Sequence, residues 1–291
     1  MPPSDFPSGT TVTIQKGMSL GEASYLLKEN NYIRSRVVFE FCALSMSGSR
    51  GVQAGEYLFK EPVSLCALAG RLTRGVTGVP AVRLTIPEGS SNKEIAKIAA
   101  KNLTQFNQER FLAQAQSYEG RLFPETYFFL STANEVDVLE MMRTQFDKKI
   151  ASLEKDIEGS GHTLPEIIIM ASILEKEART EVDQKMVAGI LWKRISIKMA
   201  LQVDAPFLYT LGKTSAELTQ ADLKRDSPYN TYTRRGLPLG PIGNPGLVAI
   251  RSALYPTESP YLYYLSDNDG EMHYAKTFEE HKTNKAKYLA R

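Results

Sequence analysis

Apolar and polar residues near the start of the chain first follow the two-residue period of a strand and then the longer period of a helix. In "TVTIQKGMSLGEASYLLKENNYI", residues 11–33, Val12 and Ile14 share one face of a short strand. After a turn, Ser19 and Glu22 have the spacing of a capping box, which starts a helix. The segment therefore predicts one small β–α unit.

The same order of residue types returns further along the chain. In "AVRLTIPEGSSNKEIAKIAAKNL" the strand isoleucine, the turn glycine and the Ser/Glu capping pair keep their relative positions. Between the two copies, "GEYLFK" predicts a strand and "SLCALAGRLTRG" a helix that Gly75 ends. Two copies do not make a repeat array, so we predict two related β–α modules, over about 11–78 and 79–118.

The rest of the chain has mainly the apolar period of helices. The segment "EGRLFPETYFFL" is expected to be irregular at Pro124, and helices are predicted over about 134–154, 164–179 and 182–198. "DSPYNTYTRRGLPLGPIGNPG" is a long loop, and such a loop inside a compact domain is usually functional or disordered. "YLYYLSDNDGEMHYAK" predicts a β-hairpin, followed by a polar helix. Together these patterns predict an α+β protein whose mainly helical domain covers 119–291.

Length and composition exclude several classes of protein. A chain of 291 residues can bury a sizeable core and is long enough for two domains. Its 35 basic and 33 acidic residues leave a net charge of +2, which gives no electrostatic argument for nucleic-acid binding. No apolar run reaches the length of a membrane span. The start "MPPSDFPSGT" has no signal-peptide pattern, so residues 1–10 are expected to be a disordered leader or linker.

The sequence contains no metal-binding motif. Cys42 and Cys66 are the only cysteines, and they form no CxxC or Cys/His spacing. The three histidines form no HExxH motif, so no zinc site is expected. Both cysteines lie in apolar stretches, which favours buried free thiols; a disulfide is an alternative that the sequence does not imply.

Two glutamates follow the apolar run "EIIIMASIL", and the helical period separates them. Thr163 and Glu166 form the capping box that begins the helix. At about 100° per residue, Glu177 falls on the arc of apolar residues, whereas Glu175 falls on the other side, near Ser172. We therefore interpret Glu175 as solvated and Glu177 as facing the interior. Desolvation there raises the pKa of a carboxyl, as a general acid near neutral pH requires.

A structural explanation of Glu177 stays open, because its side chain could reach solvent or pair with Arg179 or Lys193.

Neighbouring segments favour a site for sugars, which need aromatic faces and side-chain amides. Packing of the tyrosines in the core and helix capping by the aspartate are the alternatives. The candidate residues are Gln202 and Asp204 from "ALQVDAPFLYTLG", and Tyr229, Asn230, Thr231 and Tyr232 from "SPYNTYT".

Five segments carry a family resemblance: "LFPETYFF", "ASILEKEA", "LQVDAPFLYTLG", "SPYNTYTRRGLPLGPIGNPG" and "SPYLYYLSDNDGEMHYAKTFEEHK". In this order they resemble the endolytic murein transglycosylases, the YceG-like or MltG proteins, over about 80–291. The resemblance implies small LysM-like modules in front of a lysozyme-like transglycosylase domain. It also places the family's essential glutamate, the second of the EKE pair, on Glu177. The residues implied to line the cleft are Gln202, Asp204, Tyr229, Asn230 and Tyr232.

The resemblance also implies a location and partners. The family is bacterial, is anchored by one N-terminal transmembrane helix, and cuts nascent glycan strands at the outer face of the inner membrane. This chain has no such helix, so we expect an ectodomain whose anchor is absent. Its expected partners are peptidoglycan glycan strands and the peptidoglycan synthases of the elongation or division machinery.

The implied reaction is non-hydrolytic cleavage of the β-1,4 bond between N-acetylmuramic acid and N-acetylglucosamine, with Glu177 as general acid and then base. It needs no metal or organic cofactor. A hydrolytic muramidase that uses Asp204 as a second carboxylate is one alternative. A glycan-binding scaffold of the cell wall without catalysis is another.

Overall fold

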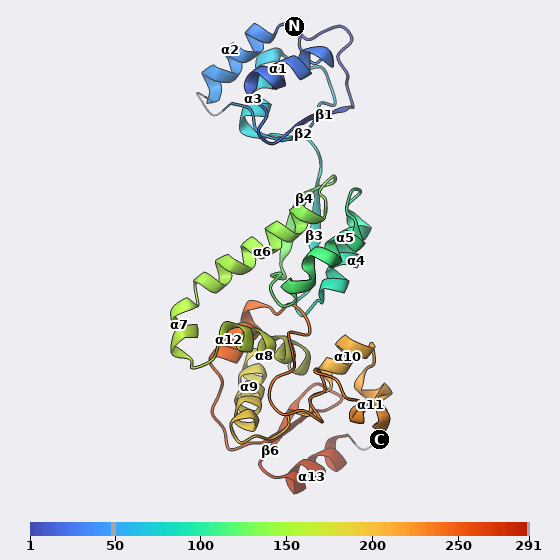
Figure 1. The fold of residues 1–291 in the computed structure, drawn as a ribbon, viewed down its shortest axis with the longest axis vertical. Coiled ribbons are helices and arrows are strands. Elements are labelled where there is room, and N and C mark those ends of the chain that lie inside the picture. The colour runs from blue at the N-terminus through green and yellow to red at the C-terminus, as the bar shows by residue number, and fades with distance from the viewer. Residues whose placement is uncertain (48–50, 290–291) are drawn as a thin grey trace. The chain divides into compact units, whose positions relative to one another are not determined.

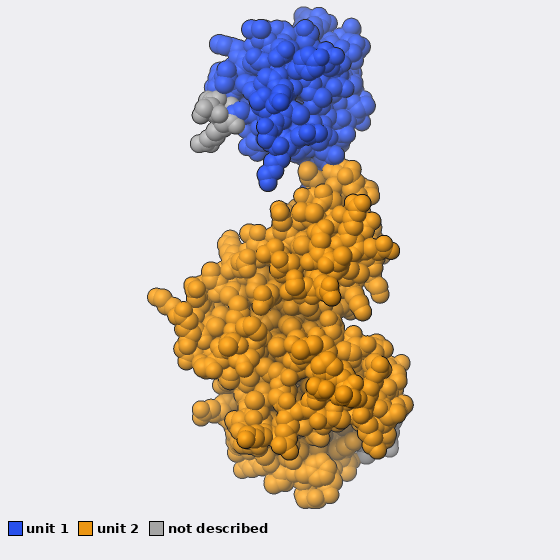
Figure 2. All heavy atoms as spheres, in the orientation of Figure 1, with its two compact units in different colours: residues 1–81 blue, residues 82–291 orange. Residues whose placement is uncertain are grey.

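The structure is a computed structural model that describes residues 1–47 and 51–289. It divides into two compact units, residues 1–81 and 82–291, which are coloured separately in Figure 2. The described residues form thirteen α-helices and three two-stranded sheets, so the prediction of an α+β protein is confirmed. Over the same residues, no helix is both long and apolar enough to span a membrane.

The first unit is a β-α-α-β module with one further helix (Figure 1). Its strands are antiparallel, with Thr11 opposite Leu58 and Ile14 opposite Gly55. The capping box that the sequence predicts forms as expected at the start of the first helix. The elements are β1 (Thr11–Ile14), α1 (Leu20–Glu29), α2 (Arg36–Ser47), β2 (Gly55–Leu58) and α3 (Leu65–Arg74).

The leader expected over residues 1–10 is partly built into this unit. Phe6 is buried, and its ring meets Tyr32 edge-on with centroids 5.4 Å apart and Phe59 at 6.0 Å. Burial of an aromatic side chain offsets the entropy lost when the segment is ordered. The expectation of a disordered leader is therefore wrong around Phe6.

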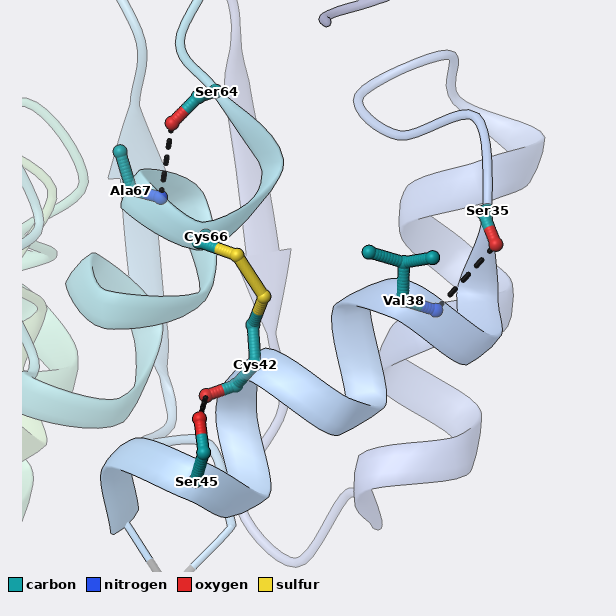
Figure 3. Close-up of a disulfide and its surroundings, with 7 residues drawn as sticks. All are labelled: Ser35, Val38, Cys42, Ser45, Ser64, Cys66 and Ala67. Atoms are coloured by element: carbon teal, nitrogen blue, oxygen red, sulfur yellow. Dashed lines mark hydrogen bonds between the residues drawn. A yellow bond between two sulfur atoms is a disulfide. The ribbon is translucent and has the colours of Figure 1, made fainter.

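The two cysteines are joined in a disulfide between α2 and α3 (Figure 3). Cys42 is buried, whereas Cys66 lies on the exposed side of α3. The expectation of two buried free thiols is wrong. Both residues stand in apolar stretches, but the sequence alone does not show that the two helices pack side by side, which brings their Cα atoms to 5.3 Å.

The second unit begins with another β-α-α-β arrangement. β3 and β4 form its sheet, and its core extends into the first half of α6. Because β4 completes the sheet, this module continues past residue 118, and the chain after Pro124 is a regular strand. The elements are β3 (Ala81–Thr85), α4 (Asn92–Asn102), α5 (Gln108–Ala115), the short 3₁₀ helix η2 (Gln116–Tyr118) and β4 (Thr126–Leu130).

The predicted helices and the hairpin are present among the remaining elements, together with short helices between residues 205 and 254 that the sequence did not predict. The hairpin is antiparallel, with Tyr263 opposite Ala275. The elements are α6 (Glu135–Ala151), α7 (Glu154–Gly159), α8 (Leu164–Glu177), α9 (Glu181–Ser196), α10 (Ala205–Leu211), η3 (Ser215–Glu217), α11 (Gln220–Lys224), α12 (Leu247–Leu254), β5 (Tyr263–Ser266), β6 (Met272–Ala275) and α13 (Phe278–Tyr288).

Helix α8 is the centre of the second unit. It begins at the predicted capping box of Thr163 and Glu166, and every residue of 167–174 is buried. It packs against α12, α9 and α10 (Figure 1). The proline-rich loop adds a further contact, since the Ile242 N–H donates to Ser172 Oγ at 3.1 Å. Between its first and last turns the helix therefore has no solvated face, unlike the amphipathic helix that the sequence suggests.

Candidate active site

A cavity of about 620 Å³ opens at the C-terminal end of α8, and Glu177 lies in its wall. The cavity brings together segments far apart in the sequence: the end of α8, the start of α10, the β5–β6 hairpin and α13. Four of the seven predicted site residues line it, namely Glu177, Gln202, Asp204 and Tyr232. The volume is in the range of a site for a small ligand or for a short part of a polymer.

Glu177 is half-buried and is held by two donors. The Tyr264 hydroxyl donates to Oε2 at 2.9 Å, and the Ala205 N–H donates to the same carboxylate. Burial is the main cause that raises the pKa of Glu177 to about 7, and the nearby charge of Asp204 acts in the same direction. The two hydrogen bonds and Arg194 act in the opposite direction and are included in this value. The carboxyl can therefore both give and take a proton near neutral pH.

Asp204 stands at the N-cap position of α10 but does not cap the helix with its side chain. Its Oδ1 instead accepts from the Tyr232 hydroxyl at 2.5 Å. Burial is the main reason that the pKa of this tyrosine rises above its ordinary value, followed by the bond to Asp204. The alternative of a capping aspartate is thus replaced by a hydrogen-bonded pair on the cavity wall.

Gln202 extends an exposed side chain at the cavity and has an unusual backbone. Its φ angle is +49°, in the left-handed region that residues other than glycine rarely adopt. Its N–H donates to the Thr231 carbonyl at 3.0 Å, which fixes this conformation against the tyrosine-rich loop. Such backbone strain is concentrated at functional sites in proteins.

The other three predicted residues, Tyr229, Asn230 and Thr231, do not line the cavity. Asn230 and Thr231 are both buried, with 2% of their surface exposed. Asn230 Nδ2 donates to two backbone carbonyls and Oδ1 accepts from the Tyr232 N–H at 2.8 Å, while the Thr231 hydroxyl is paired with the backbone of Val203. Tyr229 packs on Tyr209 away from the cavity. The structure therefore does not bring these side chains into the cavity.

Glu175 is not solvated, contrary to the expectation from the helical period. It is half-buried, and its Oε2 accepts from the Gly246 N–H at 2.9 Å. Burial raises the pKa of its carboxyl as well. The physical reason is the proline-rich loop, which covers the side of α8 that the sequence leaves open. Only Lys176, between the two glutamates, is exposed.

Sequence reasoning missed the residues that surround Glu177 from the hairpin and from α9. Arg194 is buried, and its Nε and Nη1 donate to the carbonyls of Leu262 and Leu201 at 2.7 and 2.6 Å. Arg179 and Lys193 form no ion pair with Glu177 in the part of the chain that the structure describes. The tyrosine run of "YLYYLS" was the available signal for the hairpin residues.

Aromatic side chains form one wall of the cavity. The Tyr263 ring lies 5.9 Å from the Phe278 ring and 5.5 Å from the His281 ring, between centroids. Phe278 is 55% exposed, so one side of its ring is open to a ligand in the cavity. Flat apolar faces of this kind can stack on a sugar ring.

One group of residues could hold a metal ion by its composition. The ligand atoms of Asp267 and Glu271, from the turn between β5 and β6, and of His273, from β6, lie within 4.8 Å of one another. Asp267 already accepts from the N–H groups of Asp269 and Glu271 and contacts His273 Nε2 at 2.7 Å. These contacts close the turn, and none of the three candidate ligands lines the cavity.

Comparison with known proteins assigns the chain to a family. The sequence profile of the YceG-like family matches residues 12–287. The endolytic murein transglycosylase of Bacillus subtilis is 31% identical over 99% of this chain and 88% of its own length. The endolytic murein transglycosylase of Streptococcus pneumoniae serotype 2 is 28% identical over 96% of this chain, which spans 58% of that protein.

A solved structure supports the same assignment. The crystal structure of a yceG-like protein from Listeria monocytogenes is 30% identical in sequence, with a TM-score of 0.64. The match covers 94% of this chain and 98% of the other. The chain therefore belongs to the YceG-like family.

Proposed function

We propose that the protein is an endolytic murein transglycosylase that cuts the β-1,4 bond between N-acetylmuramic acid and N-acetylglucosamine within glycan strands. The names of its relatives in Bacillus subtilis and Streptococcus pneumoniae support this activity. The observation that carries the chemistry is the carboxyl of Glu177, which lies in a cavity and has a pKa of about 7.

In the proposed reaction Glu177 is the general acid and then the general base. Its proton passes to the glycosidic oxygen as the bond from C1 to that oxygen breaks, and C1 gains oxocarbenium character. The carboxylate then takes the proton of the C6 hydroxyl of the same muramyl residue. That oxygen bonds to C1 and closes a 1,6-anhydro ring, so no water is consumed and the carboxyl regains its proton.

The neighbours of Glu177 have supporting roles in this proposal. The Tyr264 hydroxyl and the Ala205 N–H fix the orientation of the carboxyl. Asp204, held by Tyr232, places a negative charge beside the reacting carbon and favours the developing positive charge. Gln202 and the exposed ring of Phe278 bind the sugars on either side.

A hydrolytic muramidase is the second candidate, because Asp204 lies close enough to raise the pKa of Glu177 and could activate a water. The Tyr232 bond to Asp204 favours a fixed electrostatic role instead, since one of its oxygens is already occupied. A scaffold without catalysis is less well supported, because binding alone does not require the desolvated carboxyl of Glu177 beside the aromatic rings.

We further propose that the two β-α-α-β arrangements are LysM-like modules that hold the strand, and that 119–291 supplies the catalytic residues. The proposal includes action at the outer face of the bacterial inner membrane, beside the peptidoglycan synthases of elongation or division. The similar order of elements in the two modules supports a common origin and a common type of ligand.

The mass of the product tests the proposed reaction. Uncrosslinked glycan strands incubated with the protein should give fragments that end in anhydro-muramic acid, lighter by one water than hydrolysis products. Reducing-end muramic acid as the main product would instead establish the muramidase. Intact strands after long incubation would establish the scaffold.

A further inference from the structure

A second hollow continues the cavity of Glu177 towards α4. It has a volume of about 450 Å³ and lies between the first turns of α4 and the length of α10. Lys176, Ala205 and Leu208 line both hollows, so one groove runs past the end of α8. Lys176 directly precedes Glu177 in the chain and lies where the two hollows join.

This second hollow, here called the lysine groove, is lined by three exposed lysines. Lys93 and Lys97 are one helical turn apart on α4, and Lys176 faces them from α8. Among residues 1–47 and 51–289, none of the three ammonium groups has a hydrogen bond or an ion pair. Glu94, Glu119 and Glu175 act on these cations only at longer range, without direct contact, so the ammonium groups are free to bind an anionic ligand.

The one carboxylate in the lining is already occupied. Glu94 Oε2 accepts from the N–H and the hydroxyl of Ser91 at 2.7 and 2.8 Å, as the capping box of α4. The phenol of Tyr209 is likewise turned inward, where it donates to Glu119 at 3.1 Å. The negative charge of Glu94 offsets part of the charge of Lys97 and Lys176, and three lysines against one glutamate still leave the lining positive.

The α4 wall of the groove is fixed to the domain that carries Glu177. Asn244 is fully buried; its Nδ2 donates to the Ser90 carbonyl at 2.9 Å and to Asn92 Oδ1 at 3.0 Å. Glu119 accepts from the Asn92 N–H at 3.0 Å. These buried bonds keep the lysines of α4 at a constant separation from the cavity, as a binding site for one rigid polymer requires.

We propose that the lysine groove is a subsite for the carboxylates that the glycan strand carries next to the bond that is cut. The proposal rests on the proposed function, because the sugars of murein are neutral rings and its negative charges are carboxylates. They come from two sources: the lactyl group of a muramyl residue that carries no peptide, and the peptide stem of a residue that does, because the stem is joined to the lactyl carboxyl by an amide bond. A strand bound at Glu177 can place such a carboxylate one or two sugars away in the groove.

Binding to the full chain carrying Glu177→Gln tests the subsite without turnover. The groove variant adds Lys93→Gln and Lys97→Gln; the matched control adds Lys148→Gln and Lys155→Gln, two exposed lysines outside the groove. The probes are strands with peptide stems, strands stripped of stems by an amidase, and uncharged oligomers of N-acetylglucosamine. The dissociation constant of each is measured by calorimetry at low and at high salt.

We expect the groove variant to bind the strands with stems about three- to tenfold more weakly at low salt, with the difference shrinking at high salt. The uncharged oligomers should bind it as they bind the control. A loss on strands with stems identifies a carboxylate of the peptide, and a loss on stripped strands identifies the lactyl carboxylate that the amidase sets free. Equal losses on both show that the groove accepts either source, and a loss confined to strands with stems identifies the peptide alone. An equal loss for all three probes, or for none, overturns the subsite.

The proposed function fails separately from the subsite. If the unmodified chain releases no anhydro products, the reaction is wrong, while the binding comparison still reports on the groove. If the reaction is confirmed, Lys93→Gln and Lys97→Gln are introduced together into the active chain. An unchanged KM for strands with stems and for stripped strands would then show that the groove has no part in substrate binding.

Discussion

The carboxyl of Glu177 and the carboxyl of Glu175 are both desolvated, but their partners differ. Glu177 meets a phenol and a backbone N–H in an open cavity, whereas Glu175 accepts from the Gly246 N–H in a closed contact with the loop. Only the first arrangement leaves room for a substrate. At the scale of single residues, access rather than burial therefore separates a catalytic carboxyl from a structural one.

Replacing each glutamate by glutamine checks this distinction. Glu177→Gln removes the titrating proton, so cleavage should fall by about 10²- to 10⁴-fold. Glu175→Gln should cleave within a few-fold of the parent, because an amide oxygen can still accept from Gly246. Both raised pKa values disfavour the ionised form on folding, so neither change should lower the melting temperature at pH 7. Loss of activity in Glu175→Gln alone would contradict the assignment of Glu177.

The pH dependence follows from the direction of the pKa shift. With a pKa of about 7, Glu177 is protonated below neutrality, so kcat should fall as the pH rises through about 7. Because the folded state binds this proton more tightly than the unfolded state, the raised pKa also makes the free energy of unfolding depend on pH. Its contribution is fully present below the ordinary pKa of a glutamate and is lost as the pH rises through about 7.

Tyr264→Phe provides a sharper form of this test. The phenol stabilises the carboxylate and so lowers the pKa of Glu177; without it, the falling limb of the pH–rate profile should move to higher pH. Tyr263→Phe is the matched control, since the Tyr263 hydroxyl has no bond to Glu177 in the described contacts. A limb that stays in place in Tyr264→Phe would show that another group titrates.

At the scale of elements, the sequence predicts most of the regular structure and part of the site. The helical period and capping boxes identify α6, α8 and α9 because those signals are local. The helical period gives a wrong prediction of a solvated Glu175, since it cannot show that the loop of residues 226–246 covers the second side of α8. Tyr264 was missed for the same reason, because its position beside Glu177 depends on tertiary packing of the hairpin.

The tyrosine-rich loop gives a prediction at this scale. Asn230 is buried and bonds four backbone groups, so Asn230→Ala should lower the free energy of unfolding by roughly 1–3 kcal/mol as those groups lose their partner. Tyr232→Phe removes only the hydroxyl that holds Asp204, so it should lower the rate of cleavage with a smaller change in melting temperature. Thermal unfolding and initial rates of cleavage are measured for both variants. If Asn230→Ala and Tyr232→Phe change stability and rate to the same extent, Asn230 does not have a structural role distinct from the role of Tyr232 in the site.

At the scale of the whole molecule, the two units have separate cores. One cluster of buried apolar residues draws only on positions between Phe6 and Leu72, and the other two lie between Leu84 and Leu254. The described cavity and the lysine groove are lined only by residues of the second unit. The apolar burial that stabilises the candidate site is thus independent of the first unit.

A fragment of residues 79–291, which keeps all of β3, should therefore fold and cleave by itself. We expect a cooperative thermal transition and a kcat on short strands within a few-fold of the full chain, because every residue assigned to the reaction is present. If the first unit binds glycan, KM should rise for long strands and stay constant for short ones, since only long strands can reach both units. A fragment that folds but has lost kcat on short strands would show that the first unit takes part in the chemistry itself.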